Sequence, residues 1–149
     1  MKKLIPLLTL LAAFPLAMIL FSSHGFATDK QAPGITQAEN PVEVYYFHRN
    51  RRCGPCRTIE NLTRKTVETR YADALEHGSV VFHVINVETP ENQDIAARFR
   101  VNGVAVIVAG NNGGNEKTTN FTAMAYRHAR NEEAFIAELK KVIDETINP

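Results

Sequence analysis

The sequence contains little cysteine and almost no net charge. Its two cysteines stand only three positions apart in 149 residues, which excludes a scaffold held together by several disulfides. The 17 basic residues are balanced by 16 acidic ones, which argues against a bulk nucleic-acid binder and against an acidic tail. No internal repeat or low-complexity tract is visible. The length suits one domain of ordinary size, with no room for a second large core.

The amino-terminal segment differs from the rest of the chain in composition. Two lysines precede an apolar run over residues 4–21, and small residues stand three and one positions before a cleavage point after Ala27. This pattern predicts a secretory signal peptide over residues 1–27, and hence export, to the periplasm if the source is bacterial. The alternative is an uncleaved anchor formed by residues 4–21, because an apolar run of that length can just span a bilayer.

The rest of the chain is expected to form a polar linker over residues 28–41 and one α/β domain over residues 42–149. β-Branched and aromatic residues predict strands at 42–47, 80–87, 104–108 and 118–123, with a turn at 111–115. Helical spacing predicts a helix from the cysteines to Gly78, a short one at 91–99, and a last one capped by Asn131.

The element order predicts a mixed sheet with helices on both faces. Each of the two crossovers is expected to join parallel strands, and the last two strands to form an antiparallel hairpin. The apolar strand at 80–87 suits the interior of the sheet. The last helix is expected to bury one stripe of apolar side chains, namely Phe135, Ile136, Leu139, Val142 and Ile143.

The two cysteines, Cys53 and Cys56, lie between the first strand and the first helix. Cys53 comes just before the helix, whose free N–H groups and dipole favour an anion. No acidic residue occurs between Val44 and Ile59, and four arginines surround the pair, namely Arg49, Arg51, Arg52 and Arg57. Both influences stabilise the Cys53 thiolate, so Cys53 is the predicted nucleophile and Cys56, a turn inside the helix, the resolving thiol. The arginines could also bind an anionic substrate or an acidic partner, or simply form a solvated loop.

The motif Cys53-Gly54-Pro55-Cys56 at a strand–helix junction resembles the redox motif of the thioredoxin family, and the element order from about 41 to 147 is similar as well. The resemblance implies a thioredoxin-like three-layer sandwich and a thiol–disulfide oxidoreductase with no cofactor beyond the Cys53–Cys56 disulfide. Gly54 and Pro55 resemble the dipeptide of reducing thioredoxins, which implies a reductive direction.

A narrower resemblance involves the residues around the motif. Phe47 and His48 before Arg52, together with Glu60 on the helix, resemble a small thioredoxin-like group labelled ArsF. That group is linked by name to the reduction of nitroaromatic or arsenical compounds.

Three positions depart from the thioredoxin pattern. Arg52 replaces the tryptophan that normally precedes the first cysteine, and Tyr46 or Phe47 stands where a buried aspartate assists proton transfer. The cis-proline of the loop facing the disulfide is replaced by Ala105, after Val104. A cis bond before alanine costs about 3–4 kcal/mol, so a trans bond or a rebuilt loop is expected there. Because that proline shapes the docking groove in the family, this chain need not select substrates as thioredoxins do.

Without the aspartate, another group must move the proton of Cys56. Glu60 lies four residues after Cys56 on the same helix face, and His48 titrates near neutrality in its unperturbed state. We therefore predict that Glu60 or His48 assists Cys56. The alternative for Glu60 is a surface ion pair with Arg57 or Arg64.

These features predict an exported, monomeric thiol–disulfide oxidoreductase that does not bind nucleic acid. By family resemblance, it would relay electrons from a membrane dithiol donor of the CcdA or DsbD kind to a client protein disulfide. The alternative is a metal-binding or metal-delivery module in which Cys53 and Cys56 hold a soft metal and His48 could supply a third ligand. A closed zinc site needs four ligands, which counts against the metal module, and the intact cysteine pair disfavours a non-catalytic interaction domain.

Overall fold

The computed structural model describes residues 40–148 apart from residue 113. The chain divides into the units Met1–Ala32 and Pro33–Pro149, and all described residues belong to the second unit. The predicted signal peptide and most of the predicted linker lie outside the described residues. Within residues 40–148, no helix has both the length and the hydropathy needed to span a membrane.

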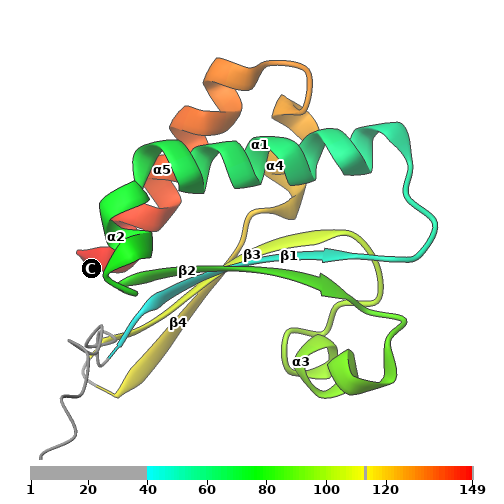
Figure 1. The fold of residues 1–149 in the computed structure, drawn as a ribbon, viewed down its shortest axis with the longest axis horizontal. Coiled ribbons are helices and arrows are strands. Elements are labelled where there is room, and N and C mark those ends of the chain that lie inside the picture. Colours follow the sequence, from blue (N-terminus) through cyan, green and yellow to red (C-terminus); the bar gives the residue numbers. More distant parts are fainter. Residues whose placement is uncertain (1–39, 113, 149) are drawn as a thin grey trace, which may run out of the picture. The chain divides into compact units, whose positions relative to one another are not determined.

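The described residues form one four-stranded sheet with helices on both faces (Figure 1). The strands are β1 (Val42–His48), β2 (Val80–Asn86), β3 (Ala105–Asn112) and β4 (Asn115–Asn120). The helices are α1 (Gly54–Arg70), α2 (Ala72–Glu76), α3 (Gln93–Arg98), α4 (Thr122–His128) and α5 (Glu132–Ile147), and the 3₁₀ turn η1 (Pro90–Asn92) precedes α3. Helices α1, α4 and α5 lie on one face of the sheet and α3 on the other, so the predicted three-layer α/β arrangement is confirmed.

Strand β1 lies inside the sheet and divides the core into two parts. Val42, Val44 and Tyr46 belong to the cluster shared with α1 and α5, whereas Tyr45 and Phe47 belong to the smaller cluster near α3. All five side chains are buried, as expected for alternate residues of a strand that is covered on both faces. His48 continues the first set, because it follows Tyr46 by two positions, and it therefore faces α1.

Helix α5 confirms the predicted cap and most of the predicted stripe. The Asn131 side chain accepts a hydrogen bond from the Ala134 N–H at 3.1 Å, which satisfies one of the free donors at the start of the helix. Phe135, Leu139 and Ile143 are fully buried, while the other two residues of the stripe are half-buried.

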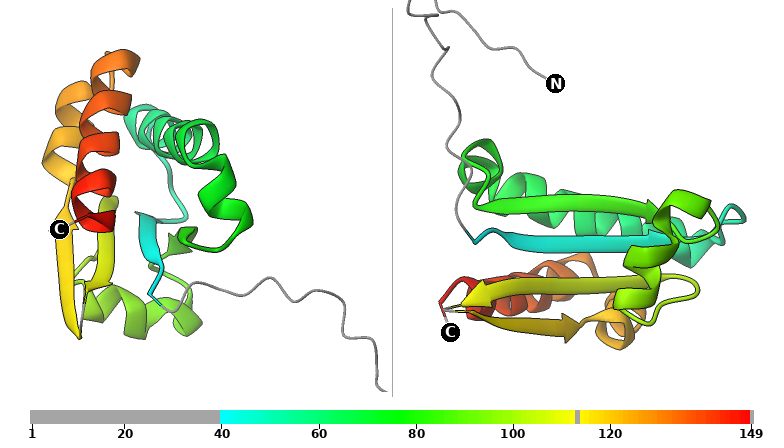
Figure 2. Two further views of the ribbon diagram at one scale, coloured as in Figure 1. Left: turned by 90° about the vertical axis from the view of Figure 1, so that its left-hand side faces the viewer. Right: turned by 90° about the horizontal axis from the view of Figure 1, so that it is seen from below.

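Two predictions about the sheet are wrong. β3 pairs with β1 in the antiparallel direction, because the connection through α3 reverses the chain at the end of the sheet where β2 stops (Figure 2). Only β1 and β2 form a parallel pair among the described strands. The strand order β2-β1-β3-β4 also places β2 at an edge of the described sheet instead of inside it. Its apolar side chains pack against the helices on each face. Their hydrophobic pattern therefore resembles that of an interior strand.

Two predicted boundaries are also wrong. The first helix ends at Arg70 and a separate helix starts at Ala72, because Tyr71 leaves the helical conformation and its hydroxyl donates to the Asp144 carboxylate at 2.7 Å. The predicted last strand at 118–123 is displaced: β4 occupies Asn115–Asn120 and α4 follows directly. The Thr122 hydroxyl accepts from the Val106 N–H, which ties the start of α4 to β3.

Candidate active site

The two cysteines form a disulfide at the first turn of α1, and their Cα atoms are 5.0 Å apart. Cys53 is the N-cap residue, and its Sγ accepts a hydrogen bond from the Cys56 N–H at 3.1 Å. The Cys53 residue is exposed, whereas Cys56 is only 6% exposed. Of the two residues, Cys53 is therefore the one that an incoming thiolate can approach from solvent.

The local sequence explains this geometry. Pro55 stands in the first turn, where its missing N–H costs no helical hydrogen bond and its fixed φ suits the start of a helix. The Thr58 hydroxyl donates to the Gly54 carbonyl and the Arg57 N–H to the Cys53 carbonyl, so the turn is hydrogen-bonded from its first residue. The motif thus presents the Cys53 sulfur at the positive end of a 17-residue helix.

The loop between β1 and the motif is held by its neighbours. The Arg49 guanidinium donates to the Asn102 carbonyl, with its Nε at 2.8 Å, and so anchors the loop that precedes β3. The Asn50 N–H donates to the Glu88 carboxylate at 2.7 Å, beyond the end of β2. Arg49, predicted as an electrostatic activator of the thiolate, is therefore used at least in part to join two loops.

Arg52 is the centre of a polar cluster beside the motif. Its guanidinium forms an ion pair with Glu60 and a hydrogen bond to the His48 Nε2 at 2.6 Å. Because arginine only donates, Nε2 is the acceptor, and the ring proton lies on Nδ1, which donates to the Arg49 carbonyl at 3.0 Å. Glu60 also approaches Arg64 at 3.6 Å. The sequence placed Arg52, Glu60 and His48 near the cysteines but did not indicate that Arg52 joins the other two.

One of the two partners expected for Glu60, Arg64, is confirmed, and Arg52 is an additional partner. The ion pairs of Glu60 are formed with Arg52 and Arg64, not with Arg57. The Glu60 side chain is 12% exposed, so the carboxylate is mostly removed from solvent. Arg51 and Arg57 are exposed and form no ion pair with any described residue. Proton transfer to Cys56 by Glu60 or His48 stays a prediction.

Tyr46 is a site residue whose contact the sequence did not reveal. Its hydroxyl donates to the Cys56 carbonyl at 2.8 Å, so a fully buried side chain of β1 touches the first turn of α1. Burial raises the pKa of Tyr46 to about 12, with a smaller contribution from the Glu60 carboxylate. The available signal was strand alternation, which puts Tyr46 and His48 on the same face.

The loop before β3 has the backbone that the sequence predicted. The described residues contain no cis peptide bond, so the bond between Val104 and Ala105 is trans. Ala105 is buried and opens β3 opposite Phe47, at the end of the sheet where β1 leads into the motif. The Arg49 guanidinium holds this loop by donating to the Asn102 carbonyl, and this contact does not depend on a proline at position 105.

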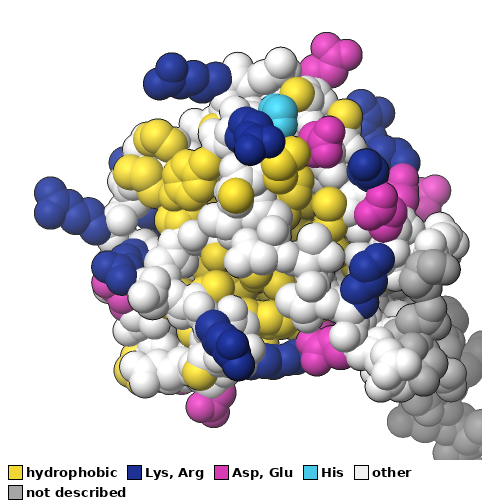
Figure 3. All heavy atoms as spheres, turned by 180° about the vertical axis from the view of Figure 1, so that it is seen from behind, with side chains coloured by type: hydrophobic (Ala, Val, Ile, Leu, Met, Phe, Trp, Pro, Cys, Tyr) yellow, Lys and Arg dark blue, Asp and Glu magenta, His cyan; other side chains and the backbone are white. Residues whose placement is uncertain are grey.

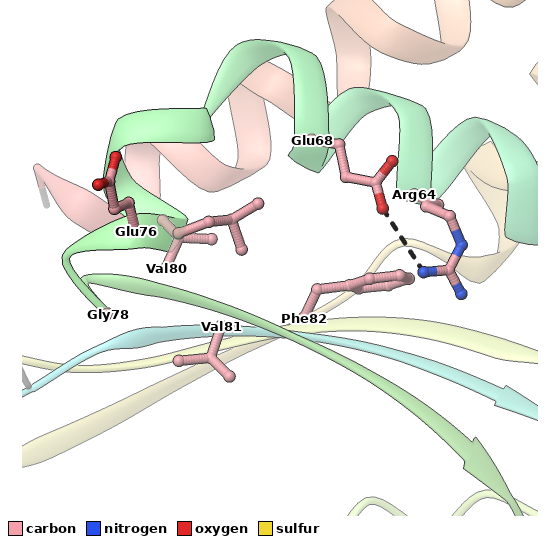
Figure 4. Close-up of a pocket in the computed structure, with 8 residues that line it drawn as sticks. Arg64, Glu68, Glu76, Gly78, Val80, Val81 and Phe82 are labelled. Atoms are coloured by element: carbon pink, nitrogen blue, oxygen red, sulfur yellow. Dashed lines mark ion pairs between the residues drawn. The ribbon is translucent and has the colours of Figure 1, made fainter.

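A large hollow on the described surface, about 830 Å³ in volume, lies away from the cysteine motif. It is enclosed by the later turns of α1, by α2 and by the edge strand β2 (Figure 4). Arg64 and Glu68 pair across one side of it at 3.6 Å, and Phe82 lies beneath them. It contains neither cysteine nor histidine, so it offers no thiol chemistry.

The described residues contain no group of three or more His, Cys, Asp or Glu side chains arranged to hold an ion. His48, which the alternative prediction names as an optional third ligand, has both ring nitrogens hydrogen-bonded.

Comparison with known proteins returned no matching family model and no matching curated protein. Similar solved structures include the thioredoxin of Fasciola hepatica, with 22% identity and a TM-score of 0.42 over 71% of this chain and 81% of that one. Another is the chloroplastic thioredoxin z, with 21% identity and a TM-score of 0.38 over 63% of this chain and 80% of that one. Likenesses at this level establish no family membership, and the narrower resemblance to the ArsF group finds no support in them.

The mixed sheet with helices on both faces and the cysteine pair at the start of α1 agree with the arrangement expected from the sequence, whereas the direction of β3, the edge position of β2 and the separate helices α2 and α4 do not. The fold is thioredoxin-like. This fold presents a CxxC pair of the thioredoxin type, and together they support thiol–disulfide oxidoreductase chemistry.

Proposed function

We propose that this chain is an exported thiol–disulfide oxidoreductase that acts as a reductant, with Cys53 as nucleophile and Cys56 as resolving thiol. The observation that carries the proposal is the asymmetry of the pair. Cys53 is exposed and accepts a backbone N–H at the helix terminus, whereas Cys56 is buried behind it. Hydrogen bonds and helix dipoles stabilise a thiolate more than a thiol, so the same contacts favour ionised Cys53 in the reduced protein.

The reaction begins with both cysteines reduced. The Cys53 thiolate attacks one sulfur of a client disulfide, the client S–S bond breaks, and the released client thiolate takes up a proton. Cys56 then loses its proton and attacks the Cys53 sulfur, which releases the second client thiolate for protonation. The client gains two electrons and two protons, and the protein is left with the Cys53–Cys56 disulfide.

The surrounding residues have distinct roles in this proposal. Gly54 and Pro55 shape the turn that holds the two sulfurs together. Glu60 or His48 assists the removal of the proton from the Cys56 thiol. Arg52 holds both of these side chains in place. The signal-like sequence of residues 1–27 supports export, and reduction outside the cytoplasm then requires a membrane dithiol donor, of the CcdA or DsbD kind, to restore the thiols.

Mixed-disulfide trapping tests the assignment of the two cysteines. With a peptide that contains one disulfide, Cys56→Ser should accumulate a covalent adduct through Cys53, because the resolving thiol is missing. Cys53→Ser, the matched control, should form almost none, because Cys56 is buried. Intact mass under non-reducing conditions measures both. More adduct with Cys53→Ser than with Cys56→Ser would overturn the assignment.

Redox titration of the wild-type pair in glutathione buffers tests the direction. A potential of about −270 mV is expected for a reductant, whereas a value of about −120 mV would mean that the protein oxidises its clients.

A further inference from the structure

A groove lies directly beside the redox motif. It has a volume of about 460 Å³ and separates the first turns of α1 from α4 and the turn that follows α4. Pro55 and Thr58 form one wall, and Tyr126, Arg127 and Arg130 form most of the other. Because Pro55 stands between the two cysteines in the sequence, a segment lying in this groove would contact the motif itself, although neither cysteine lines the groove.

The groove exposes an aromatic side chain. Tyr126 is 46% exposed, and it is one of two large hydrophobic residues that are exposed among the described residues. An aromatic ring at this position provides apolar contact area for a bound chain at small entropic cost. Figure 3 shows hydrophobic side chains over the upper and central parts of one face of the molecule, with both basic and acidic side chains around them.

The groove is also basic. Arg127 and Arg130 line it, no acidic residue does so, and neither arginine forms an ion pair with a described residue. Arg57, which directly follows Cys56, is exposed and also forms no ion pair within the described part of the chain. By contrast, Arg64 and Arg98 are paired with carboxylates. Unlike Arg52, which pairs with Glu60, these three arginines therefore carry positive charge that no described carboxylate neutralises through an ion pair.

We propose that this groove binds the polypeptide segment of a client that carries the disulfide and has acidic side chains next to it. The proposal rests on the function proposed above and specifies its substrate class. An apolar side chain of the client packs on Tyr126, and carboxylates pair with Arg127 and Arg130. Arginine suits this role because its planar fork binds a carboxylate through two parallel hydrogen bonds.

Peptides with the same disulfide ring but different flanks test the proposal. One carries glutamates beside the ring, a second lysines and a third only neutral residues. The reduced wild-type protein should reduce the acidic peptide with a kcat/KM about tenfold above that of the lysine peptide at low salt. Raising the salt from about 20 mM to about 500 mM should remove most of this preference.

Substitutions identify the residues that cause the preference for the acidic peptide. Changing both Arg127 and Arg130 to Ala should lower the acidic-to-lysine ratio to about twofold or less. Arg70→Ala is the matched control, because Arg70 is also exposed but lies about 24 Å along α1 from Gly54, and it should retain the full ratio. A Cys53→Ser/Cys56→Ser protein should still bind the labelled acidic peptide more tightly than the lysine peptide, as fluorescence anisotropy would show without any exchange chemistry.

The outcomes separate the two proposals. If the wild type reduces none of the three peptides, the proposed function fails. If it reduces all three at similar rates, or if Arg70→Ala lowers the ratio as much as the double variant does, the oxidoreductase stands and the acidic-client groove is wrong. A preference for the lysine peptide would also overturn the groove.

Discussion

At the scale of single residues, Arg52 is the least conventional part of the site. Its side chain is 29% exposed and contacts both Glu60 and His48, so one guanidinium neutralises a mostly buried carboxylate and satisfies a buried imidazole. Removing one member of a shielded ion pair leaves its partner without compensation, which costs more than the loss of a surface pair.

Arg52→Gln should therefore lower the free energy of unfolding by about 1–3 kcal/mol, because Glu60 keeps only the longer contact with Arg64. Urea unfolding of the oxidised protein measures the change. Arg57→Gln, which removes only a 3.5 Å contact with a carbonyl, should change it by less than about 0.5 kcal/mol.

A double variant identifies the cause. Adding Glu60→Gln to Arg52→Gln should recover part of the loss, since the uncompensated carboxylate is then gone. If the two substitutions are additive, the ion pair does not explain the role of Arg52.

At the scale of elements, the packing of α5 on β3 depends on a glycine. A Cβ added at Gly110 would lie 2.5 Å from the Thr146 Cγ2 and 3.5 Å from a methyl group of Val42. Thr146 is buried on α5, so its side chain cannot simply turn into solvent. The close approach of the helix to the strand therefore leaves no room for a side chain at this position.

Gly110→Ala should destabilise the protein by about 1–3 kcal/mol, the usual cost of overpacking a core. Gly54→Ala is the control: a Cβ there meets nothing within 4 Å, so stability should stay the same or rise by up to about 1 kcal/mol. Thermal unfolding of both variants makes the comparison.

A second-site change tests the mechanism of this prediction. Thr146→Ser removes the clashing methyl group and keeps the hydroxyl that donates to the Val142 carbonyl at 2.8 Å. In the Gly110→Ala background it should restore most of the lost stability. No rescue would show that the contact with Thr146 is not the cause.

At the scale of the whole domain, three buried tyrosines link stability to alkaline pH. Burial raises the pKa of Tyr46 to about 12, and burial is also the main cause of the raised pKa values of Tyr45 and Tyr71. Above about pH 10 the unfolded chain releases these phenolic protons while the folded protein retains them. The unfolded state then binds fewer protons, so the free energy of unfolding falls as pH rises.

We therefore expect stability to decline between about pH 10 and pH 12, with each tyrosine contributing at most about 1.4 kcal/mol per pH unit. Urea unfolding of the disulfide-bonded protein at intervals from about pH 8 to pH 11.5 measures the slope. Tyr46→Phe should make the slope shallower. A stability that is constant over this range would contradict the prediction.

Much of the fold could be predicted because its signals are local. Alternation in β1, the Asn131 cap and the apolar stripe of α5 each depend on neighbours within a few residues. The edge position of β2 and the reversed direction of β3 depend on how a connection crosses the sheet, which short-range patterns do not encode.

The candidate site likewise has features that depend on local sequence and features that depend on contacts between elements. The cysteine spacing and the start of a helix by themselves determined the exposed Cys53 at the N-cap and the shielded Cys56, because helix geometry relates residues three apart. Only the tertiary structure decided that Arg52 contacts both Glu60 and His48. The same holds for the hydrogen bond from Tyr46 to the Cys56 carbonyl and for the groove that α4 forms beside Pro55. These contacts join residues of different elements, and the directions of long side chains follow from packing between elements, not from the order of residues in the chain.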